Sequence, residues 1–414
     1  MNYQETIAYI HQTPKFNREL GNHLLKKLLS HCENPEQKLK FIHIAGTNGK
    51  GSTAIMLSEI LQSAGYKTGL FTSPYIERFN ERMRVNGIPI PDETLAEIVS
   101  ELRDIIECYD APVSEFALDT AAAFCWFYQQ NVDFVVLETG LGGRLDATNV
   151  ISESMVSIIT TIGLDHTQYL GTTYAEIAAE KCGIIKKNCP VVSYPVQEDE
   201  VWEVLRQYTD KNHAPLAIAE IPEPLKDGML LQGKYYPLGL KGEFQMYNAA
   251  TVLKAIDVLR KQGVKISDSA VNEGLKKAKN PARFERFGSQ IILDGAHNPQ
   301  AILSLCQALH ACNRPIYFCT AMMEDKDYTA CISILAQYAK GVVATEIEMP
   351  RCCSSEILAE GFKNHGMEEV RSVKSPQDAL QEALSLAGKD GLVCVCGSLY
   401  LAGILRPYLH EYFQ

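Results

Sequence analysis

The sequence predicts an α/β fold built on parallel sheets. Short apolar runs rich in β-branched residues, typical of buried parallel strands, alternate with longer segments whose apolar residues recur at helical spacing. Such alternation is typical of strand–helix–strand units. The strand-like runs are 39–45, 132–138, 155–161, 290–294, 315–320, 342–346 and 392–396, and the helical segments include 54–65, 94–109, 116–130, 248–262, 299–311, 327–339 and 376–387.

Two segments interrupt this alternation. Residues 214–240 are rich in Pro and Gly and have short apolar runs, which we interpret as a small antiparallel appendage. Residues 276–282 follow a helical segment and precede a strand, so they are the best candidate for an interdomain linker. Because 414 residues are too many for one ordinary core, we expect two domains, 1–280 and 281–414.

Composition limits the classes of function. The chain has 39 Lys+Arg against 50 Asp+Glu and no basic run with interleaved aromatics, so we expect no nucleic-acid partner. No apolar stretch approaches the roughly 20 residues that span a bilayer, and the N-terminus has no signal-peptide pattern. The 13 cysteines are scattered without CxxC spacing. We expect free thiols and a reducing, cytoplasmic compartment.

The most informative segment is 41–52, in which an apolar strand leads into Gly46-Thr-Asn-Gly-Lys-Gly-Ser52. Backbone N–H groups of such a loop and of the following helix N-terminus bind anions, and Lys50 adds a mobile positive charge. The spacing is shorter than that of the strict G-x-x-x-x-G-K-[ST] loop. We predict a shortened cradle for a nucleoside triphosphate; the alternative is a tight turn rich in Gly and Asn.

Polar residues follow later strands, at the ends where open α/β sheets place their sites. Glu138 ends a strand and leads into the glycine-rich stretch 139–149, so its carboxylate is a candidate Mg²⁺ ligand; a charged strand cap is the alternative. His166 follows the next strand beside Asp165, which could orient the ring toward a metal. Lys181 lies further on, where the pattern alone does not distinguish it from a solvated lysine.

The second half begins with a similar arrangement. Asp294 ends a strand and could hold a ribose or phosphate ligand, and His297 follows a Gly turn and could face the cleft between domains. The alternative is an Asx-turn that leads into a helix at Pro299. Arg283, just past the linker, could reach an anion from the second domain.

Taken together, these segments resemble the folylpolyglutamate synthase/dihydrofolate synthase family of the Mur ligase superfamily, nearly from end to end. The resemblance rests on ten ordered motifs: GTNGKGS (46–52), TSPYIERFNERM (72–83), ETGLGGRLDATN (138–149), LDH (164–166), AEKCGIIK (179–186), GEFQMYNA (242–249), PARFE (281–285), LDGAHNP (293–299), DKD (325–327) and GSLYLAG (397–403).

The resemblance implies a P-loop parallel-sheet ATPase domain with a small antiparallel appendage, followed by a smaller Rossmann-like α/β domain. It implies ATP contacts from Asn48, Gly49, Lys50, Gly51, Ser52, Asn248, Arg283 and Asp294. It implies ligands for two Mg²⁺ ions from Ser73, Glu138, His166 and a carbamoylated Lys181. Catalytic roles fall on Lys50, Lys181 and His297, and substrate contacts on Arg82, Asp146 and Ser398.

The implied reaction is ATP-dependent formation of an amide bond to L-glutamate through an acyl phosphate. Only 45 residues precede Gly46, too few for the domain of about 100 residues that cell-wall muramyl-peptide ligases carry there, which favours a folate or dihydropteroate substrate. The rival interpretations are a P-loop phosphotransferase acting on a small-molecule hydroxyl and a non-catalytic nucleotide-binding protein. Bifunctional and polyglutamylation-only enzymes share these motifs, so acceptance of dihydropteroate stays open. Segment 16–22, expected before the first helix, is the candidate segment for this difference. We expect a monomer.

Overall fold

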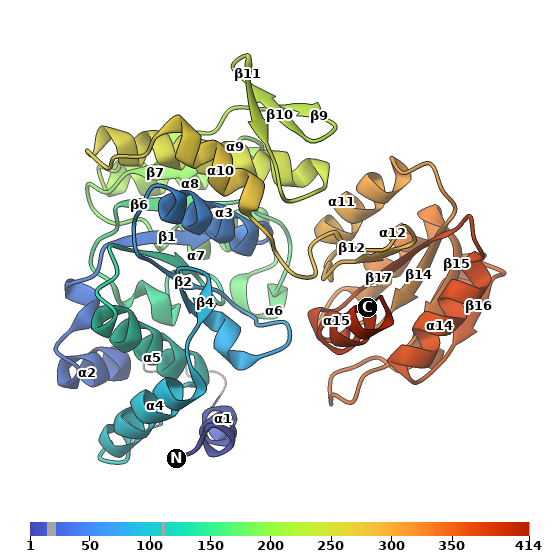
Figure 1. Ribbon diagram of the computed structural model, residues 1–414, viewed down its shortest axis with the longest axis horizontal. Helices are drawn as coiled ribbons and strands as arrows, with labels where there is room; N and C mark the ends of the chain where they lie inside the picture. Colours follow the sequence, from blue (N-terminus) through green and yellow to red (C-terminus); the bar gives the residue numbers. More distant parts are fainter. Residues whose placement is uncertain (15–21, 110–111, 414) are drawn as a thin grey trace. The chain divides into compact units, whose positions relative to one another are not determined.

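The computed structural model describes residues 1–14, 22–109 and 112–413, which form two compact units (Figure 1). The first unit contains residues 1–239 and 245–279, and the second contains residues 240–244 and those from 280 onward. Each unit has its own sheet, covered by helices on both faces.

The described residues of the first unit form an eight-stranded sheet in the order β4-β3-β2-β5-β1-β6-β7-β8. The six neighbouring strands β2, β5, β1, β6, β7 and β8 are parallel. At the edge of the sheet, β3 pairs antiparallel with β2, and β4 pairs antiparallel with β3. Buried parallel strands need no polar alternation, which explains why β1 reads as a continuous apolar run. The strands are β1 (Phe41–Ala45), β2 (Thr68–Phe71), β3 (Met83–Val85), β4 (Ile88–Pro89), β5 (Phe134–Glu138), β6 (Val156–Ile159), β7 (Val191–Ser193) and β8 (Leu216–Ile218).

One face of this sheet is covered by α1 (Tyr3–Gln12), α2 (His23–His31), α4 (Asp92–Ile106) and α5 (Glu115–Gln129), which share an apolar core with β1, β2 and β5 (Figure 1). The opposite face carries α3 (Lys50–Ser63), α9 (Glu243–Lys261) and α10 (Asp268–Lys277). A Cβ on Gly274 of α10 would lie 2.5 Å from the Ile60 backbone, so glycine allows α10 and α3 to pack closely. The remaining elements are α6 (Thr167–Leu170), α7 (Tyr174–Cys182), α8 (Asp199–Lys211), η1 (Pro35–Gln37), η2 (Phe79–Arg82) and η3 (Ala147–Val150).

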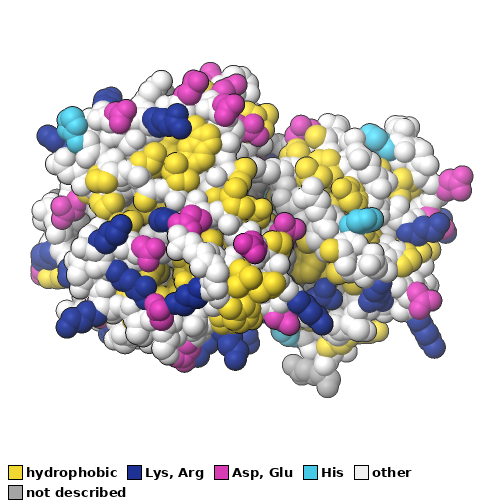
Figure 2. Space-filling view, turned by 90° about the horizontal axis from the view of Figure 1, so that it is seen from above, with side chains coloured by type: hydrophobic (Ala, Val, Ile, Leu, Met, Phe, Trp, Pro, Cys, Tyr) yellow, Lys and Arg dark blue, Asp and Glu magenta, His cyan; other side chains and the backbone are white. Residues whose placement is uncertain are grey.

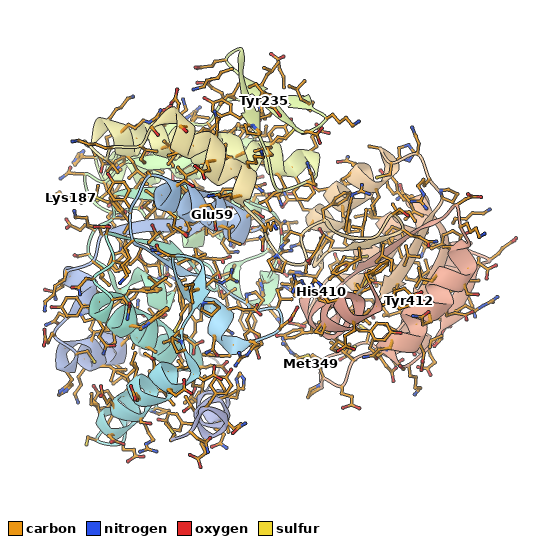
Figure 3. All side chains as sticks on the ribbon, in the orientation of Figure 1. Glu59, Lys187, Tyr235, Met349, His410 and Tyr412 are labelled. Atoms are coloured by element: carbon orange, nitrogen blue, oxygen red, sulfur yellow. The ribbon has the colours of Figure 1, made fainter. Side chains whose placement is uncertain are left out.

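The predicted antiparallel appendage is confirmed as a three-stranded sheet of β9 (Glu223–Leu225), β10 (Gly228–Leu231) and β11 (Lys234–Pro237). Tyr235, labelled in Figure 3, belongs to β11 and is about half exposed. The predicted range 214–240 was too wide, because β8 pairs in parallel with β7 in the main sheet. This strand has three partly exposed residues, which is too short a run to show a period.

The second unit has a six-stranded sheet among its described residues, in the order β12-β13-β17-β14-β15-β16 with only β12 antiparallel. Its strands are β12 (Glu285–Phe287), β13 (Ile291–Leu293), β14 (Ile316–Thr320), β15 (Ala339–Ala344), β16 (Val370–Ser372) and β17 (Leu392–Cys396). One face packs on α11 (Pro299–His310), α12 (Tyr328–Tyr338) and α13 (Ser355–Asn364). The other packs on α14 (Pro376–Ala387) and α15 (Leu399–Tyr412). The predicted α/β class is thus confirmed in both units.

The cysteines and the surface charges are distributed as the composition indicates. Each of the 13 cysteines is a free thiol, and eight of them are buried, as Cys125, Cys306 and Cys394 are. Basic and acidic side chains are interspersed on the face shown in Figure 2. Of the described helices, none combines the length and apolar character that a membrane span requires.

Candidate active site

The loop between β1 and α3 is fixed by the chain that follows β6. Thr47 N–H donates to the Thr161 carbonyl (2.8 Å), and the Thr160 hydroxyl donates to the Asn48 carbonyl (2.8 Å). The Gly163 N–H donates to the Thr47 hydroxyl (2.9 Å). These bonds engage the N–H and hydroxyl of Thr47 and the carbonyl of Asn48, so contacts within the protein shape the loop.

Two glycines are required by this shape. A Cβ on Gly46 would lie 1.7 Å from the Thr160 hydroxyl oxygen. Gly49 has φ +86°, and its Cβ would lie 2.4 Å from the Asn248 amide oxygen. Gly49 is also the N-cap of α3, whose first turn has no acidic residue and no side-chain cap among the described residues. The positive end of the α3 dipole is therefore left for an anion.

A buried chain of hydrogen bonds joins α9 to the start of α3. The Asn248 amide N–H donates to the Gln245 side-chain oxygen (3.0 Å), and the Gln245 amide N–H donates to the Ser52 hydroxyl (3.1 Å). Ser52 and Asn248 were both predicted to contact ATP, and Gln245 links them. No sequence pattern marks Gln245 beyond its place in the motif 242–249, because its partner lies 193 positions away.

Two predicted lysines meet at one carbonyl. Lys50 Nζ lies 3.1 Å from the Gly46 carbonyl oxygen and 3.2 Å from that of Thr47. Lys181 Nζ lies 2.7 Å from the same Gly46 oxygen, and the residue is 5% exposed. Lys181, on the last turn of α7, is therefore a buried lysine at the phosphate loop and not a solvated one.

The acidic residue that ends β5 lies at the same edge of the sheet. Glu138 pairs in register with Ile44 of β1, so its side chain emerges beside the loop. It is 4% exposed, and one carboxylate oxygen accepts the Ser73 N–H (3.1 Å). The structure thus places Ser73 and Glu138, both predicted metal ligands, against each other.

His166 begins α6 in the left-handed region (φ +51°). The Asp165 carboxylate accepts the His166 backbone N–H (2.8 Å), whereas the ring Nε2 lies 4.0 Å away, beyond hydrogen-bond distance. Asp165 therefore shapes the backbone here and also lies within ion-pair distance of the ring, and its role in orienting His166 toward a metal stays a prediction. The His166 side chain is 37% exposed.

These residues fit one nucleotide-bound Mg²⁺ better than an independent metal centre. Among the described residues, no three His, Cys, Asp or Glu side chains gather to hold a metal. Mg²⁺ at phosphates commonly needs only one or two protein carboxylates, which Glu138 beside Ser73 provides. An ammonium donates and has no lone pair, so Lys181 offers a ligand atom only after modification.

Asp146 orders its own loop. Its carboxylate accepts the N–H of Leu141 (2.8 Å), the N–H of Thr148 (3.0 Å) and the Thr148 hydroxyl. Burial raises the pKa of Asp146, and these hydrogen bonds act against that shift. The predicted substrate contact of Asp146 stays a prediction. The side-chain amide of Asn22 donates to the backbone carbonyl of Asp146 (2.9 Å). The rest of the segment 16–22 lies outside the described residues. The segment follows α1 in the chain, whereas we expected it before the first helix.

In the second unit, Asp294 shapes the turn after β13. Its carboxylate accepts the N–H groups of Phe284 (2.7 Å) and Ala296 (2.8 Å), so the Asx-turn considered as an alternative is present. Burial raises the pKa of Asp294, and the nearby Arg283 guanidinium opposes this shift. The structure therefore brings Arg283 and Asp294 together.

The remaining predicted residues of this unit lie on the adjacent turn. The His297 ring nitrogen Nδ1 lies 2.8 Å from the Gly295 carbonyl oxygen. Ser398 caps α15 by accepting the Tyr400 N–H (3.1 Å), and the Gly397 N–H donates to the Ala296 carbonyl (2.8 Å). The ends of β13 and β17 thus hold His297 and Ser398 at one edge of the sheet.

Comparisons with known proteins identify the family of this chain. The Mur ligase middle domain matches residues 44–256, and the glutamate ligase domain of Mur ligases matches residues 282–399. The Bacillus subtilis dihydrofolate synthase/folylpolyglutamate synthase is 35% identical, over 98% of this chain and 99% of its own length. This chain belongs to the folylpolyglutamate synthase/dihydrofolate synthase family of Mur ligases.

Solved structures of this family share the fold. The E. coli protein FolC, in complex with DHPP and ADP, aligns with a TM-score of 0.89 at 27% identity, over 100% of this chain and 99% of that chain. A Mycobacterium tuberculosis folylpolyglutamate synthase complexed with ADP and AMPPCP aligns with a TM-score of 0.88 at 30% identity, over 98% of both chains. The resemblance read from the motifs is thus confirmed at the level of family and fold.

Proposed function

We propose that this chain is an ATP-dependent ligase that adds L-glutamate to folates, and that it also accepts dihydropteroate. The observation that carries the proposal is the convergence of the shortened phosphate loop, Glu138 and the buried Lys181 at one edge of the first sheet. The names of relatives support both acceptors, since the Bacillus subtilis and E. coli proteins are named for both synthases.

The chemistry requires ATP because a carboxylate is a poor electrophile. The acceptor carboxylate attacks the γ-phosphorus, ADP leaves, and an acyl phosphate forms. The amine of L-glutamate then attacks the activated carbonyl carbon, and phosphate leaves with the carbon–oxygen bond electrons. The α3 N-terminus, with Asn48, Gly49, Gly51 and Ser52, holds the phosphates, and Lys50 offsets their charge.

Ser73, Glu138 and His166 would hold Mg²⁺, which supplies positive charge where carboxylate and triphosphate meet. A Yersinia pestis relative was solved with AMPPNP and a Mn ion. We further propose that Lys181 carries a carbamate, formed when its neutral amine adds CO₂ and releases a proton. The carbamate N–H would keep the bond to the Gly46 carbonyl, while its oxygens would become ligands for a second Mg²⁺.

The second unit would supply the other substrate contacts. Arg283 and Asp294 would contact the nucleotide, as Asn248 would from the first unit, and His297 and Ser398 would lie near the incoming glutamate. In this proposal the domains are residues 1–280 and 281–414, and the enzyme acts as a cytoplasmic monomer.

The test is the substrate dependence of ADP release. We expect release to require both a folate or pteroate acceptor and L-glutamate, and the product mass to increase by one glutamyl unit. A mass increase of one phosphoryl group would support the rival phosphotransferase, and absence of turnover with every acceptor would support a nucleotide-binding protein. Dihydropteroate and tetrahydrofolate assayed side by side decide whether both activities are present.

A further inference from the structure

A carboxylate without hydrogen bonds lies inside the first unit. Asp119, on α5, is 1% exposed, and neither of its carboxylate oxygens has a hydrogen-bond partner among the described residues. Its helix neighbours Ala121, Ala122 and Ala123 are buried and apolar. A buried charge is costly unless a partner compensates it, so the presence of Asp119 calls for an explanation.

The only oppositely charged group that acts on Asp119 among the described residues is Arg82, the last residue of η2. Arg82 Nη1 lies 3.7 Å from an Asp119 oxygen, which is an ion pair but not a hydrogen bond. The guanidinium carbon lies 5.3 Å from the Tyr75 ring centre and 5.4 Å from that of Phe79. Charge and two aromatic faces therefore hold Arg82, and its Nε has no hydrogen-bond partner among the described residues.

Arg82 is also tied to the candidate metal site. Its carbonyl accepts the N–H of Thr72 (3.0 Å), and the next residue, Ser73, donates to Glu138. The backbone carbonyl of Arg82, on the other side of the residue from its guanidinium, is thus connected to the carboxylate beside the phosphate loop through two hydrogen bonds.

The other charged neighbours are few. Glu115 lies one turn before Asp119 on α5, with one oxygen 3.2 Å from Nδ1 of His11 on α1 and the other without a described partner. Burial raises the pKa of Asp119 to about 7, Glu115 adds to this shift and Arg82 opposes it. Asp119 therefore changes charge near neutral pH.

We propose that Asp119 is a positioning residue: its carboxylate holds the Arg82 guanidinium by charge, without a hydrogen bond, so that the N–H donors of Arg82 stay available for an acidic group of the folate acceptor. The inference rests on the proposed function, because it takes Arg82 as an acceptor contact. A guanidinium has five N–H donors in a fixed plane, and an ion pair without hydrogen bonds leaves these donors unused.

The first test is the Asp119→Asn variant, which keeps the shape and removes the charge. We expect KM for the folate to rise by about 10-fold, the scale on which one hydrogen bond to a charged group contributes, with kcat and KM for ATP within about twofold. The matched control is Asp92→Asn, which removes the charge of the carboxylate paired with Arg78. Arg78 is the N-cap of η2, the short helix that ends at Arg82, and this change should alter none of these constants.

The second test is a double-mutant cycle. If Asp119 acts through Arg82, Asp119→Asn should have no further effect on KM for the folate in an Arg82→Ala background. In the wild type, KM for the folate should fall as the pH rises through about 7 and Asp119 ionises, whereas the Asp119→Asn profile should lack this step. Glu115 and His11 are present in both proteins, so their titration cancels in the comparison.

Three results would overturn the proposal: a KM for the folate that is unchanged or lowered in Asp119→Asn, an equal effect of that change without Arg82, or a pH step of equal size in the wild type and in Arg82→Ala. The last comparison does not use Asp119→Asn, so it decides the matter if that variant fails to fold. If the wild type shows no glutamate-dependent turnover, the proposed function fails. Thermal unfolding of the two single variants and the double variant then still measures whether Arg82 and Asp119 couple.

Discussion

Lys181 Nζ donates a hydrogen bond of 2.7 Å to the carbonyl oxygen of Gly46, 135 positions earlier in the chain. Lys50 Nζ approaches the same oxygen at 3.1 Å, so one carbonyl of the phosphate loop accepts from two ammonium groups. This arrangement places the Lys181 nitrogen, where we propose the carbamate, directly at the loop predicted to bind the triphosphate, and it makes Lys181 the most direct test of the site.

Replacing Lys181 by alanine should lower kcat by about 100-fold or more, the scale seen when one preorganised electrostatic group is removed. A short carboxylic acid should restore part of the activity by replacing the carbamate oxygens. The control is Lys187→Ala, which removes an exposed lysine six positions later (Figure 3). Carbon-13 NMR of the wild type with labelled bicarbonate should show one carbamate signal that is missing from Lys181→Ala; an identical spectrum would refute the modification.

Replacing Gly49 by alanine should reduce kcat/KM for ATP by about 100-fold, since a Cβ 2.4 Å from the Asn248 amide oxygen displaces either the loop or Asn248, and both are predicted to contact ATP. Gly65→Ala is the matched control, because Gly65 also has positive φ (+92°) but has no atom within 4 Å of the added Cβ. That variant should cost about 1 kcal/mol of folding free energy from backbone strain and leave KM for ATP unchanged. Equal ATP kinetics in both variants would contradict the role of the Asn248 contact.

Replacing Gln245 by leucine should raise KM for ATP while KM for L-glutamate changes little, because Asn248 and Ser52 lose the side chain that joins them. Unfolding should also become easier by about 1–3 kcal/mol, since buried polar groups are left unpaired. Thr251→Val serves as control, since the Thr251 hydroxyl is buried on the same helix but donates only to the Tyr247 carbonyl. A similar rise in KM for ATP in that control would point to general loosening of α9.

Lys186 gives a pH-dependent prediction. Burial lowers the pKa of its ammonium to about 8, from an ordinary value of 10.5. The folded state therefore binds this proton less tightly than the unfolded state, so the contribution to stability rises between pH 8 and 10.5 and is lost as the pH falls through 8. The Tm of the wild type minus the Tm of Lys186→Met should therefore increase as the pH rises over that interval. A difference that does not change with pH would show that the amine is solvated.

The parts of the fold that follow from local chemistry were predictable. The run 41–52 contains its own strand, turn glycines and helix start, and the structure has them at β1 and α3. Glu138 was found because it ends an apolar strand, and such strand ends meet at one sheet edge. By contrast, β8 was missed because three half-exposed residues carry no periodicity, and their place is decided by pairing with β7.

The parts of the site that depend on long-range contacts were not predictable. No pattern near Gln245 shows that its amide meets Ser52, and nothing in the helix 116–130 distinguishes Asp119 as the partner of Arg82. The contact of Asp165 with the His166 backbone N–H was also not predicted, because it depends on the left-handed backbone of His166.

Helix α3 begins without a side-chain cap, so a bound nucleotide would take the place of the cap. The N-cap Gly49 has no side chain that could accept from the first backbone N–H groups, so the β- and γ-phosphate oxygens would add hydrogen bonds from outside. In hydrogen-exchange terms, the amides of this turn should exchange more slowly in the ATP complex than in the free protein. The first turn of α3 would then report occupancy of the site before any chemistry takes place.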